Sequence, residues 1–331
     1  MSDGFTRAGG VDARSPIWLA PLAGVTTGVV RDFHAALGAG LVHTEMISSI
    51  GLARGNAKTL RMTGDREEKC PAVIQLFGPD ADWMRKGAET ALAARKFDAL
   101  EVNMACPMPK VTKKCGGAAL LYNPAEAGRI VKKLKPLGLP LWVKLRITDT
   151  SSHPLSTEDF CEVLAESGAD LLLLHGRYPS QRYEGTADKA AVCAAAGKFP
   201  GMVAGSGDFY SPQDARIYLE GGCTAVLAAR GILRDVFLIP KTLAHLGLPF
   251  PRKFLDPPAE TQAEILAEAG RDALRREGER RALVMVRRMS AGMFKGFPGV
   301  SSLRSELASF GDWDSAETCL LRIASSRPVV K

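Results

Sequence analysis

The sequence lacks a long apolar run. No stretch of about 18 or more consecutive apolar residues occurs among its 331 residues, which is the length a membrane-spanning helix needs. The first fifteen residues, MSDGFTRAGGVDARS, also lack the charged-then-apolar layout of a secretory signal. We therefore expect no membrane association and no secretory leader, and we expect residues 1–15 to form a flexible lead-in.

Paired cysteines are missing as well. The seven cysteines show neither a CxxC motif nor the Cys/His spacing of a structural zinc site. An odd, scattered set argues against a disulfide framework and fits a reducing compartment. We expect no bound metal and a cytoplasmic protein.

Aromatic residues make up only 7% of the chain, but the apolar content of 46% is enough for a substantial core. The net charge is +7, which is compatible with an anionic partner without establishing one. Residues 271–295 contain eight Lys or Arg against three acids. This cluster is either a solvated helix face or a contact surface, and its composition favours neither.

Eight short apolar runs recur along the chain with helical stretches between them. Each is almost continuously apolar, as expected of parallel strands covered on both faces. Eight strand–helix units predict an α/β fold, a (β/α)8 barrel over residues 16–248. A doubly wound sheet is the alternative, weakened because no GxGxxG follows the first run. The runs are 17–20, 41–45, 72–77, 99–104, 141–145, 170–175, 201–205 and 224–228.

The composition changes after residue 248. Prolines at 249, 251, 257 and 258 mark a stiff connection, and no strand-like run follows it. The remaining chain is rich in Ala, Leu, Arg and Glu. We expect a small all-helical domain over residues 249–331.

Polar or glycine-rich residues end nearly every predicted strand. The carboxyl ends of barrel strands share one rim, where barrel enzymes place their chemistry. The ends of the last two strands, around residues 205–208 and 229–231, suit a phosphate, although ordinary glycine-capped turns would look the same. Together with polar side chains on the other strands, they favour a flat, phosphorylated cofactor. The other strand ends carry Glu45, Gln75, Asn103, Cys106, Lys144, His175 and Arg177.

Several blocks, in this order, resemble the tRNA-dihydrouridine synthases, flavin enzymes that reduce uridine in RNA. The resemblance covers most of the chain, and its most specific block is the one that contains Cys106. The blocks are APLAGVTTGVVRDF (20–33), HTEMISS (43–49), IQLFG (74–78), EVNMACPMPKVTKKCGGAALL (101–121), VKLR (143–146), HGRYPSQRYEGTAD (175–188), GSGD (205–208) and MFKGFPGVSSLR (293–304).

The resemblance implies an FMN-dependent enzyme with NADPH or NADH as reductant. Cys106 would act as the general acid that protonates C5 of the uracil, while N5 of FMN delivers hydride to C6, and Asn103 would help to position the base. Lys144 would lie beside the N1/O2 edge of the flavin, although its other interpretation is an ion-pair partner for Glu45 or Glu101. The residues implied to bind FMN are Pro21, Leu22, Ala23, Gln75, Lys144, His175, Ser206, Gly207, Asp208, Ala229 and Arg230.

The chemistry is consistent with a thiol acid at position 106. An unperturbed thiol has a pKa of about 8.5, so it is protonated near neutral pH and can still release its proton. A small buried hydrophobe is the alternative interpretation, and we favour it for most of the other cysteines. Three residues depart from the family pattern: Ala105 and Ala229 replace glycines, and Ser206 replaces asparagine.

An RNA substrate would require the target uridine to leave its stack, with phosphate contacts supplying the binding energy. We expect tRNA as the partner, with ribosomal RNA open, no DNA, and a monomer. A small-molecule FMN oxidoreductase resembling dihydroorotate dehydrogenase is the rival function, against which the basic helical segment argues. An RNA-binding protein with a vestigial barrel is a third. The candidate RNA contacts are Lys110, Lys113, Lys114, Arg177, Arg275, Arg276, Arg280, Arg287 and Arg288.

Overall fold

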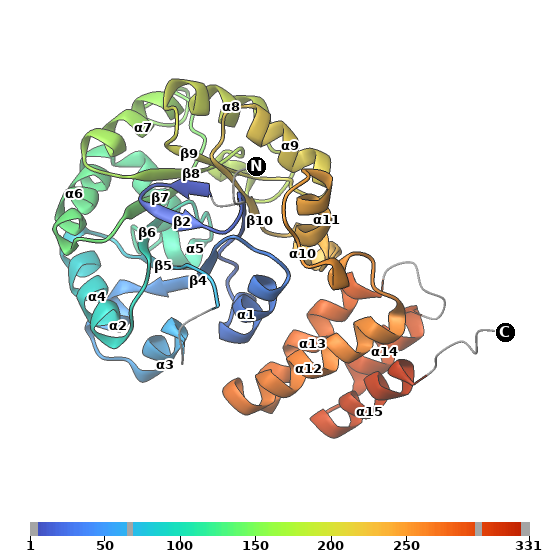
Figure 1. Ribbon diagram of the computed structural model, residues 1–331. Helices are drawn as coiled ribbons and strands as arrows, with labels where there is room; N and C mark the ends of the chain where they lie inside the picture. Colours follow the sequence, from blue (N-terminus) through green and yellow to red (C-terminus); the bar gives the residue numbers. More distant parts are fainter. Residues whose placement is uncertain (1–5, 65–68, 295–299, 326–331) are drawn as a thin grey trace.

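The computed structural model describes residues 6–64, 69–294 and 300–325. Eight parallel strands close into a barrel in the order β10-β3-β4-β5-β6-β7-β8-β9 (Figure 1). Every predicted apolar run contributes one strand, so the (β/α)8 barrel is confirmed. The strands are β3 (Ile17–Leu19), β4 (Val42–Ser48), β5 (Ala72–Phe77), β6 (Ala99–Met104), β7 (Leu141–Arg146), β8 (Leu171–His175), β9 (Val203–Ser206) and β10 (Ala225–Ala228).

Helices surround the barrel, and side-chain caps explain where several begin. Asp80, Asn123, Ser156, Asp188 and Ser211 each accept a hydrogen bond from a backbone N–H in the first turn of the following helix. The helices are α1 (Gly28–Ala36), α2 (Ser49–Ala53), α3 (Ala57–Leu60), α4 (Ala81–Ala94), α5 (Pro109–Thr112), α6 (Pro124–Leu134), α7 (Thr157–Glu166), α8 (Lys189–Lys198), α9 (Pro212–Glu220), α10 (Gly231–Arg234) and α11 (Leu238–His245). Short 3-10 turns are η1 (Arg61–Thr63), η2 (Gly117–Tyr122), η3 (Lys135–Leu137), η4 (Pro179–Gln181) and η5 (Arg252–Phe254).

The amino-terminal segment corrects one expectation. Residues 6–13 are not a loose lead-in but an antiparallel hairpin of β1 (Thr6–Ala8) and β2 (Val11–Ala13). Trp142 donates its indole N–H to the Gly9 carbonyl at 2.8 Å. A Cβ on Gly9, whose φ is +52°, would lie 2.6 Å from both Leu171 and Trp142, so the turn fits tightly against the barrel. Residues 1–5 lie outside the described residues.

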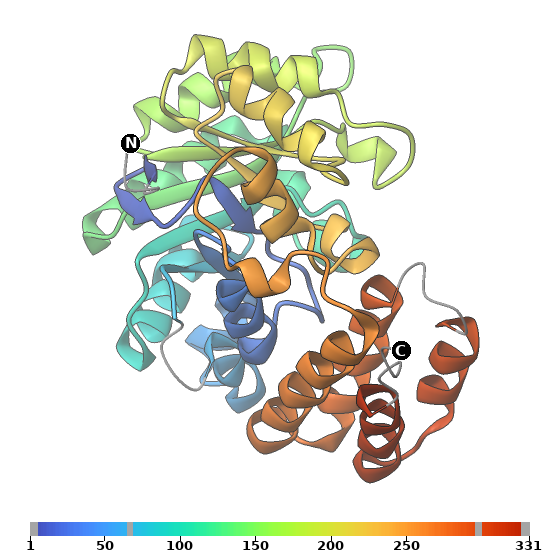
Figure 2. The ribbon, with the colours of Figure 1, turned by 45° about the vertical axis from the view of Figure 1, so that its right-hand side comes forward.

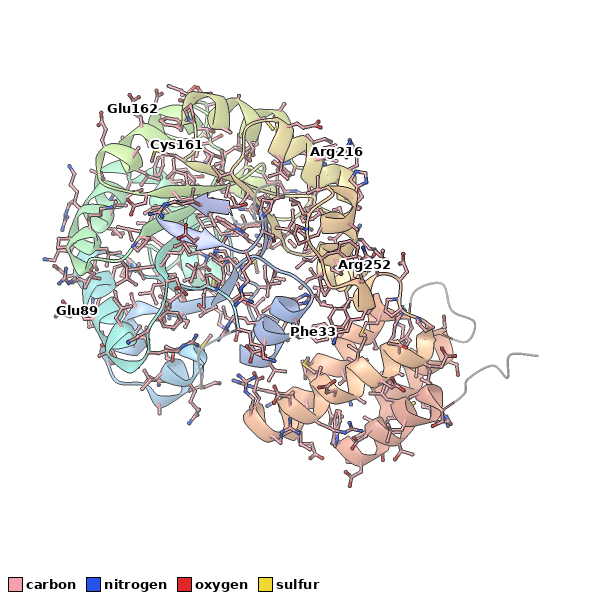
Figure 3. The ribbon with its side chains drawn as sticks, viewed as in Figure 1. Phe33, Glu89, Cys161, Glu162, Arg216 and Arg252 are labelled. Atoms are coloured by element: carbon pink, nitrogen blue, oxygen red, sulfur yellow. The ribbon has the colours of Figure 1, made fainter. Side chains whose placement is uncertain are left out.

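The strands are buried on both faces, as their sequence predicts. Side chains on one face of the strands form an apolar cluster together with hairpin residues. This cluster includes the stacked rings of Trp18 and Trp142, whose centres are 5.3 Å apart. The other face packs against the helices. Figure 3 shows Cys161 on the inner side of α7 and Glu162 pointing outwards, and burial of Cys161 agrees with a packing role.

Four further helices form a group beside the barrel (Figures 1 and 2). They are α12 (Ala259–Glu277), α13 (Glu279–Met293), α14 (Val300–Ser309) and α15 (Trp313–Ala324), and the described residues beyond 258 contain no strand. Their apolar core continues into the barrel through Val29, Val30, Phe237 and the partly buried Phe33 (Figure 3). Among the described residues, no helix is both long and apolar enough to cross a bilayer.

Candidate active site

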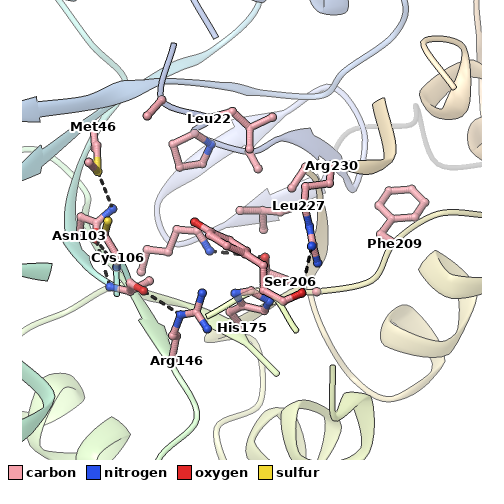
Figure 4. A pocket seen from close by; sticks show the side chains of 18 of the residues that line it. Leu22, Met46, Asn103, Cys106, Arg146, His175, Ser206, Phe209, Leu227 and Arg230 are labelled. Carbon is pink, nitrogen blue, oxygen red and sulfur yellow. Dashed lines mark hydrogen bonds between the residues drawn. The ribbon is translucent and has the colours of Figure 1, made fainter. Parts of the chain in front are cut away.

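A cavity opens at the carboxyl ends of the barrel strands (Figure 4). The structure brings every residue predicted to bind the cofactor into its wall, together with Cys106 and Asn103; their individual roles stay predictions. The same wall contains residues to which the sequence assigned no role. These are Ala20, Met46, Ala105, Met108, Arg146, Tyr183, Phe209, Tyr210 and Leu227.

The loop after β3 forms one side of the cavity through Pro21, Leu22 and Ala23. The Leu22 N–H donates to the Thr26 hydroxyl at 3.0 Å, which closes the loop into a turn. The Gly24 N–H donates to the carboxylate of Glu45. Glu45 therefore supports this loop from β4 and is not part of the cavity wall.

Cys106 follows β6 in a turn that is anchored on both sides. The Asn103 side-chain carbonyl accepts from the Ala105 N–H at 3.1 Å and from the Cys106 N–H at 2.9 Å. The Cys106 carbonyl accepts from the Ala118 N–H at 2.9 Å, and a Cβ on Gly117 would meet that carbonyl at 2.6 Å. Ala105 is not among the described residues with positive φ, so its Cβ is accommodated without backbone strain.

The surroundings of Cys106 keep its thiol protonated. Burial raises the pKa of Cys106, and only smaller opposing effects come from the Met108 N–H and the charge of Arg146. The Arg146 guanidinium is hydrogen-bonded to the loops after β6 and β8: it donates to the Ala105 carbonyl at 2.8 Å and to the Tyr178 carbonyl at 3.1 Å. Burial lowers the pKa of Arg146 to about 10, which leaves it charged at neutral pH.

Lys144 and His175 project from neighbouring strands into the same cavity. Lys144 donates to the Ser206 hydroxyl at 3.4 Å, and no described carboxylate lies within 4.0 Å of its ammonium group. Burial lowers its pKa to about 8, against the opposing charge of Glu101. Burial, and then the charge of Lys144, hold the pKa of His175 well below its ordinary value, so its imidazole is neutral.

The loops after β9 and β10 meet at the end of the cavity opposite Cys106 (Figure 4). A Cβ on Gly231 would lie 2.2 Å from the Phe209 carbonyl, so only glycine allows the two loops to approach this closely. Asp208 accepts from the Ala187 N–H at 2.7 Å and from Arg230 at 3.2 Å. Burial would raise the pKa of Asp208, but these bonds and that of Arg177 hold it below the ordinary value. Its carboxylate therefore orients Arg230 towards the cavity.

Arg177 does not lie where an RNA contact would need it. Its guanidinium is buried and donates to Asp208 at 2.8 Å, to the Gly185 carbonyl at 2.7 Å and to the Glu184 carbonyl at 3.0 Å. These bonds fix the loop after β8. The prediction of Arg177 as a phosphate contact is wrong for this structure, because packing of that loop consumes its donors.

The other predicted RNA contacts divide into two groups. Lys110, Lys113 and Lys114 are exposed on and after α5, which begins directly after the cavity residue Met108, and Arg275 and Arg280 are exposed on α12 and α13. The remaining three bond to another helix or loop of the protein. Arg276 pairs with Asp32 at 2.8 Å, Arg287 donates to the Leu307 carbonyl at 3.1 Å, and the exposed Arg288 donates to the Gly24 carbonyl. Arg276 and Arg287 therefore help to hold helices together, and their contacts with RNA stay predictions.

Two cavity residues were missed for different reasons. Arg146 directly follows the predicted run 141–145, at the same rim as Lys144 and His175, but it was assigned no role. Tyr183 lies in the irregular loop after β8, where no sequence periodicity indicates the side-chain direction. In the structure it is half-exposed, with Arg146 5.5 Å and Arg230 5.3 Å from its ring centre.

Fold and cavity define the chain as a TIM-barrel protein with an enzyme-like site at the carboxyl ends of its strands. Comparison with known families then makes the assignment specific. The dihydrouridine synthase family matches residues 18–326, and the chain belongs to it. Among the described residues, no cluster of His, Cys, Asp or Glu could hold a metal ion.

Similar proteins match this chain in sequence over most of their own length. A probable tRNA-dihydrouridine synthase of Mycobacterium tuberculosis is 30% identical over 97% of this chain and 85% of its own. One from Mycobacterium leprae is 31% identical over 87% of this chain and 76% of its own. A probable tRNA-dihydrouridine synthase 1 of Synechocystis is 31% identical over 90% of this chain and 83% of its own.

Proposed function

We propose that this protein reduces the C5–C6 double bond of specific uridines in tRNA, using FMN as cofactor and NADPH or NADH as reductant. The observation that carries the proposal is the half-buried, protonated Cys106 in a cavity whose opposite end presents Arg230. Family membership supports the reaction, and the names of the similar proteins support tRNA over ribosomal RNA.

The residues present fit a flat ring with a phosphate at one end. Pro21, Leu22 and Ala23 offer an apolar wall, while Gln75 and Lys144 supply donors at the ring edge. At the other end, the loops after β9 and β10 converge on Arg230, the arrangement in which barrels bind phosphate. We therefore expect FMN to lie across the cavity, with its ring between these residues and its phosphate near Ser206, Gly207 and Ala229.

The chemistry expected of that group, when bound, is delivery of two electrons and one hydrogen to C6 of the uracil. The protein then has to supply one proton to C5, and Cys106 carries it. Its raised pKa keeps it protonated until negative charge develops on the base. Asn103 and Arg146 hold the Cys106 turn in place, and buried Lys144 offers a cation on the cavity floor.

Replacement of the thiol tests this assignment. Cys106→Ala should retain flavin and its reduction by NADPH, but lose dihydrouridine formation in unmodified tRNA by at least about 100-fold, the size of a general-acid contribution. Cys161→Ala, which removes a thiol buried on α7, is the matched control and should keep the activity. Undiminished dihydrouridine formation in the Cys106 variant would refute the acid role.

The rival function as a small-molecule oxidoreductase makes a different prediction. If tRNA is the substrate, NADPH consumption by the flavin-loaded protein should depend on added unmodified tRNA. Equal turnover on free uridine, orotate or a simple enone would favour the rival. Mass mapping of dihydrouridine in RNA from a strain lacking this protein would separate tRNA from ribosomal RNA.

A further inference from the structure

A continuous set of buried polar side chains runs beneath the cavity on strands β4, β5 and β6. His43 Nε2 lies 3.0 Å from the Glu101 carboxylate, and both side chains are fully buried. Gln75 donates its amide N–H to the other oxygen of Glu101. The Gln75 carbonyl accepts from the Asn103 amide at 2.9 Å, and the Asn103 carbonyl accepts from the Cys106 N–H at 2.9 Å.

The chemistry of each partner fixes the direction of these bonds. His43 Nδ1 lies 2.7 Å from the Leu19 carbonyl, which can only accept, so Nδ1 carries a hydrogen. His43 Nε2 lies 3.0 Å from the nearer oxygen of Glu101, but neither atom makes a hydrogen bond there. The remaining oxygen of Glu101 accepts from Gln75. A flipped Gln75 amide would set oxygen against oxygen at Glu101 and nitrogen against nitrogen at Asn103.

The direction matters because Gln75 lines the cavity. One N–H of its amide is bound to Glu101 and its carbonyl is bound to Asn103, so the second N–H is the polar group left for a ligand. The orientation of the Asn103 amide is fixed in the same way, because its side-chain carbonyl accepts from the N–H groups of both Ala105 and Cys106. The side chain at position 101 thus determines what the cavity floor offers and how the cysteine turn is held.

We infer that Glu101 is a positioning residue for the proposed reaction: it makes Gln75 present a donor to an acceptor edge of the bound heterocycle, and holds the Cys106 turn through Asn103. This rests on the proposed function. Glu101 never contacts the reacting atoms in this arrangement. It has a second effect on the same floor, since its charge opposes the loss of the Lys144 proton.

A substitution and a swap test this inference. Glu101→Gln replaces the obligate acceptor by an amide that can turn either its carbonyl or its NH2 group towards residue 75, so the orientation of Gln75 then depends on Asn103 alone. The double variant Gln75→Glu with Glu101→Gln exchanges the two groups: residue 101 now donates to residue 75, and both total charge and volume are kept. The exchanged network is satisfied, but residue 75 then offers the cavity only oxygen.

The readouts are thermal melting, FMN dissociation constant from fluorescence quenching, the visible flavin spectrum, and kcat and KM on unmodified tRNA. We expect Glu101→Gln to melt at lower temperature, to weaken FMN binding about tenfold, the factor equivalent to one hydrogen bond of about 1.4 kcal/mol, and to lower kcat more than it changes KM for tRNA. The swap should restore the melting temperature while FMN affinity and spectrum stay altered.

Two outcomes would overturn the inference. Wild-type FMN affinity and spectrum in Glu101→Gln would show that Gln75 does not depend on Glu101. Recovery of affinity together with stability in the swap would reduce Glu101 to a structural residue. Either result leaves the proposed function intact provided the wild-type protein binds FMN; failure of the wild-type protein to bind it would refute both.

Discussion

Lys144 is a charged residue placed where its charge is costly in the absence of a partner. Its side chain is buried and its pKa is lowered to about 8, chiefly by desolvation. A lysine in an unfolded chain has a pKa of about 10.4. Between these two values the unfolded chain binds more protons than the folded protein, so the contribution of Lys144 to stability rises with pH from about 8 to about 10.

Lys144→Met should therefore stabilise the flavin-free protein at neutral pH, and its advantage should shrink on the alkaline side. From pH 7 to pH 9.5 we expect the difference in free energy of unfolding between variant and wild type to fall by on the order of 2 kcal/mol. Urea titrations of both proteins at the two pH values measure it. A difference independent of pH would mean that Lys144 is not desolvated.

For single residues, the sequence predicted which side chains lie at the cavity better than it predicted their hydrogen-bond partners. Gln75, Cys106 and Lys144 were found because each ends a recognisable strand, and strand ends share one rim. Arg177 was misjudged because its burial depends on a loop that folds back 7 and 8 residues later to take its donors. The partners of Asn103 were not predictable either, since they depend on the register of three strands and one turn.

Among the elements, α12 contains two adjacent arginines with different surroundings. Arg276 is 10% exposed and bridges α12 to α1 through Asp32, whereas Arg275 is 67% exposed and pairs only with Asp272 in the described structure. Arg276 also pairs with Asp272 at 3.0 Å, and loss of a largely buried ion-pair partner costs about 3 kcal/mol. An exposed pair contributes less than about 1 kcal/mol.

We accordingly expect Arg276→Ala to lower the free energy of unfolding by about 2–3 kcal/mol and Arg275→Ala to lower it by less than about 0.5 kcal/mol. Chemical denaturation followed by circular dichroism measures both. The neighbouring position on the same helix makes Arg275→Ala a control for helix propensity. Equal losses would show that the contact of Arg276 with Asp32 contributes nothing specific.

The elements themselves were predictable to the extent that they are long or periodic. All eight barrel strands follow from buried apolar runs, and the change of composition after residue 248 indicated the helices beyond it. The hairpin of β1 and β2 did not follow, because two three-residue strands give no periodic signal. Its order comes from distant contacts with Trp142 and Leu171.

For the molecule as a whole, one of the apolar clusters joins the barrel to the carboxyl-terminal helices. Val29, Val30, Leu37 and Phe237 of the barrel are buried together with residues of α12 and α13. Truncation after Pro251 would expose this surface to solvent and promote aggregation. Loss of RNA binding in such a truncation would therefore be ambiguous, and removal of exposed charges is the better test of where RNA binds.

The exposed lysines beside the cavity make that test possible. A uridine that enters the cavity brings its flanking phosphates to the mouth, where Lys110, Lys113 and Lys114 lie next to the Cys106 turn. Replacing all three by alanine should weaken tRNA binding and make the slope of log K against log salt shallower by about 2–3, roughly one per lost phosphate contact. Filter binding between 50 and 300 mM KCl measures both.

A second triple variant loses the same charge at a different surface. It distinguishes direct phosphate contacts of the three lysines from an effect of the protein's total charge on RNA binding. Arg14, Lys69 and Lys96 are exposed and lie around a different surface hollow, between the segments that precede β3, β5 and β6. Because strand beginnings and strand ends occupy opposite rims of the barrel, these side chains face away from the cavity. Their replacement by alanine should leave the salt slope within about 0.5 of wild type. If both triple variants shift the slope equally, RNA responds only to total charge, and the mouth of the cavity is not its docking surface.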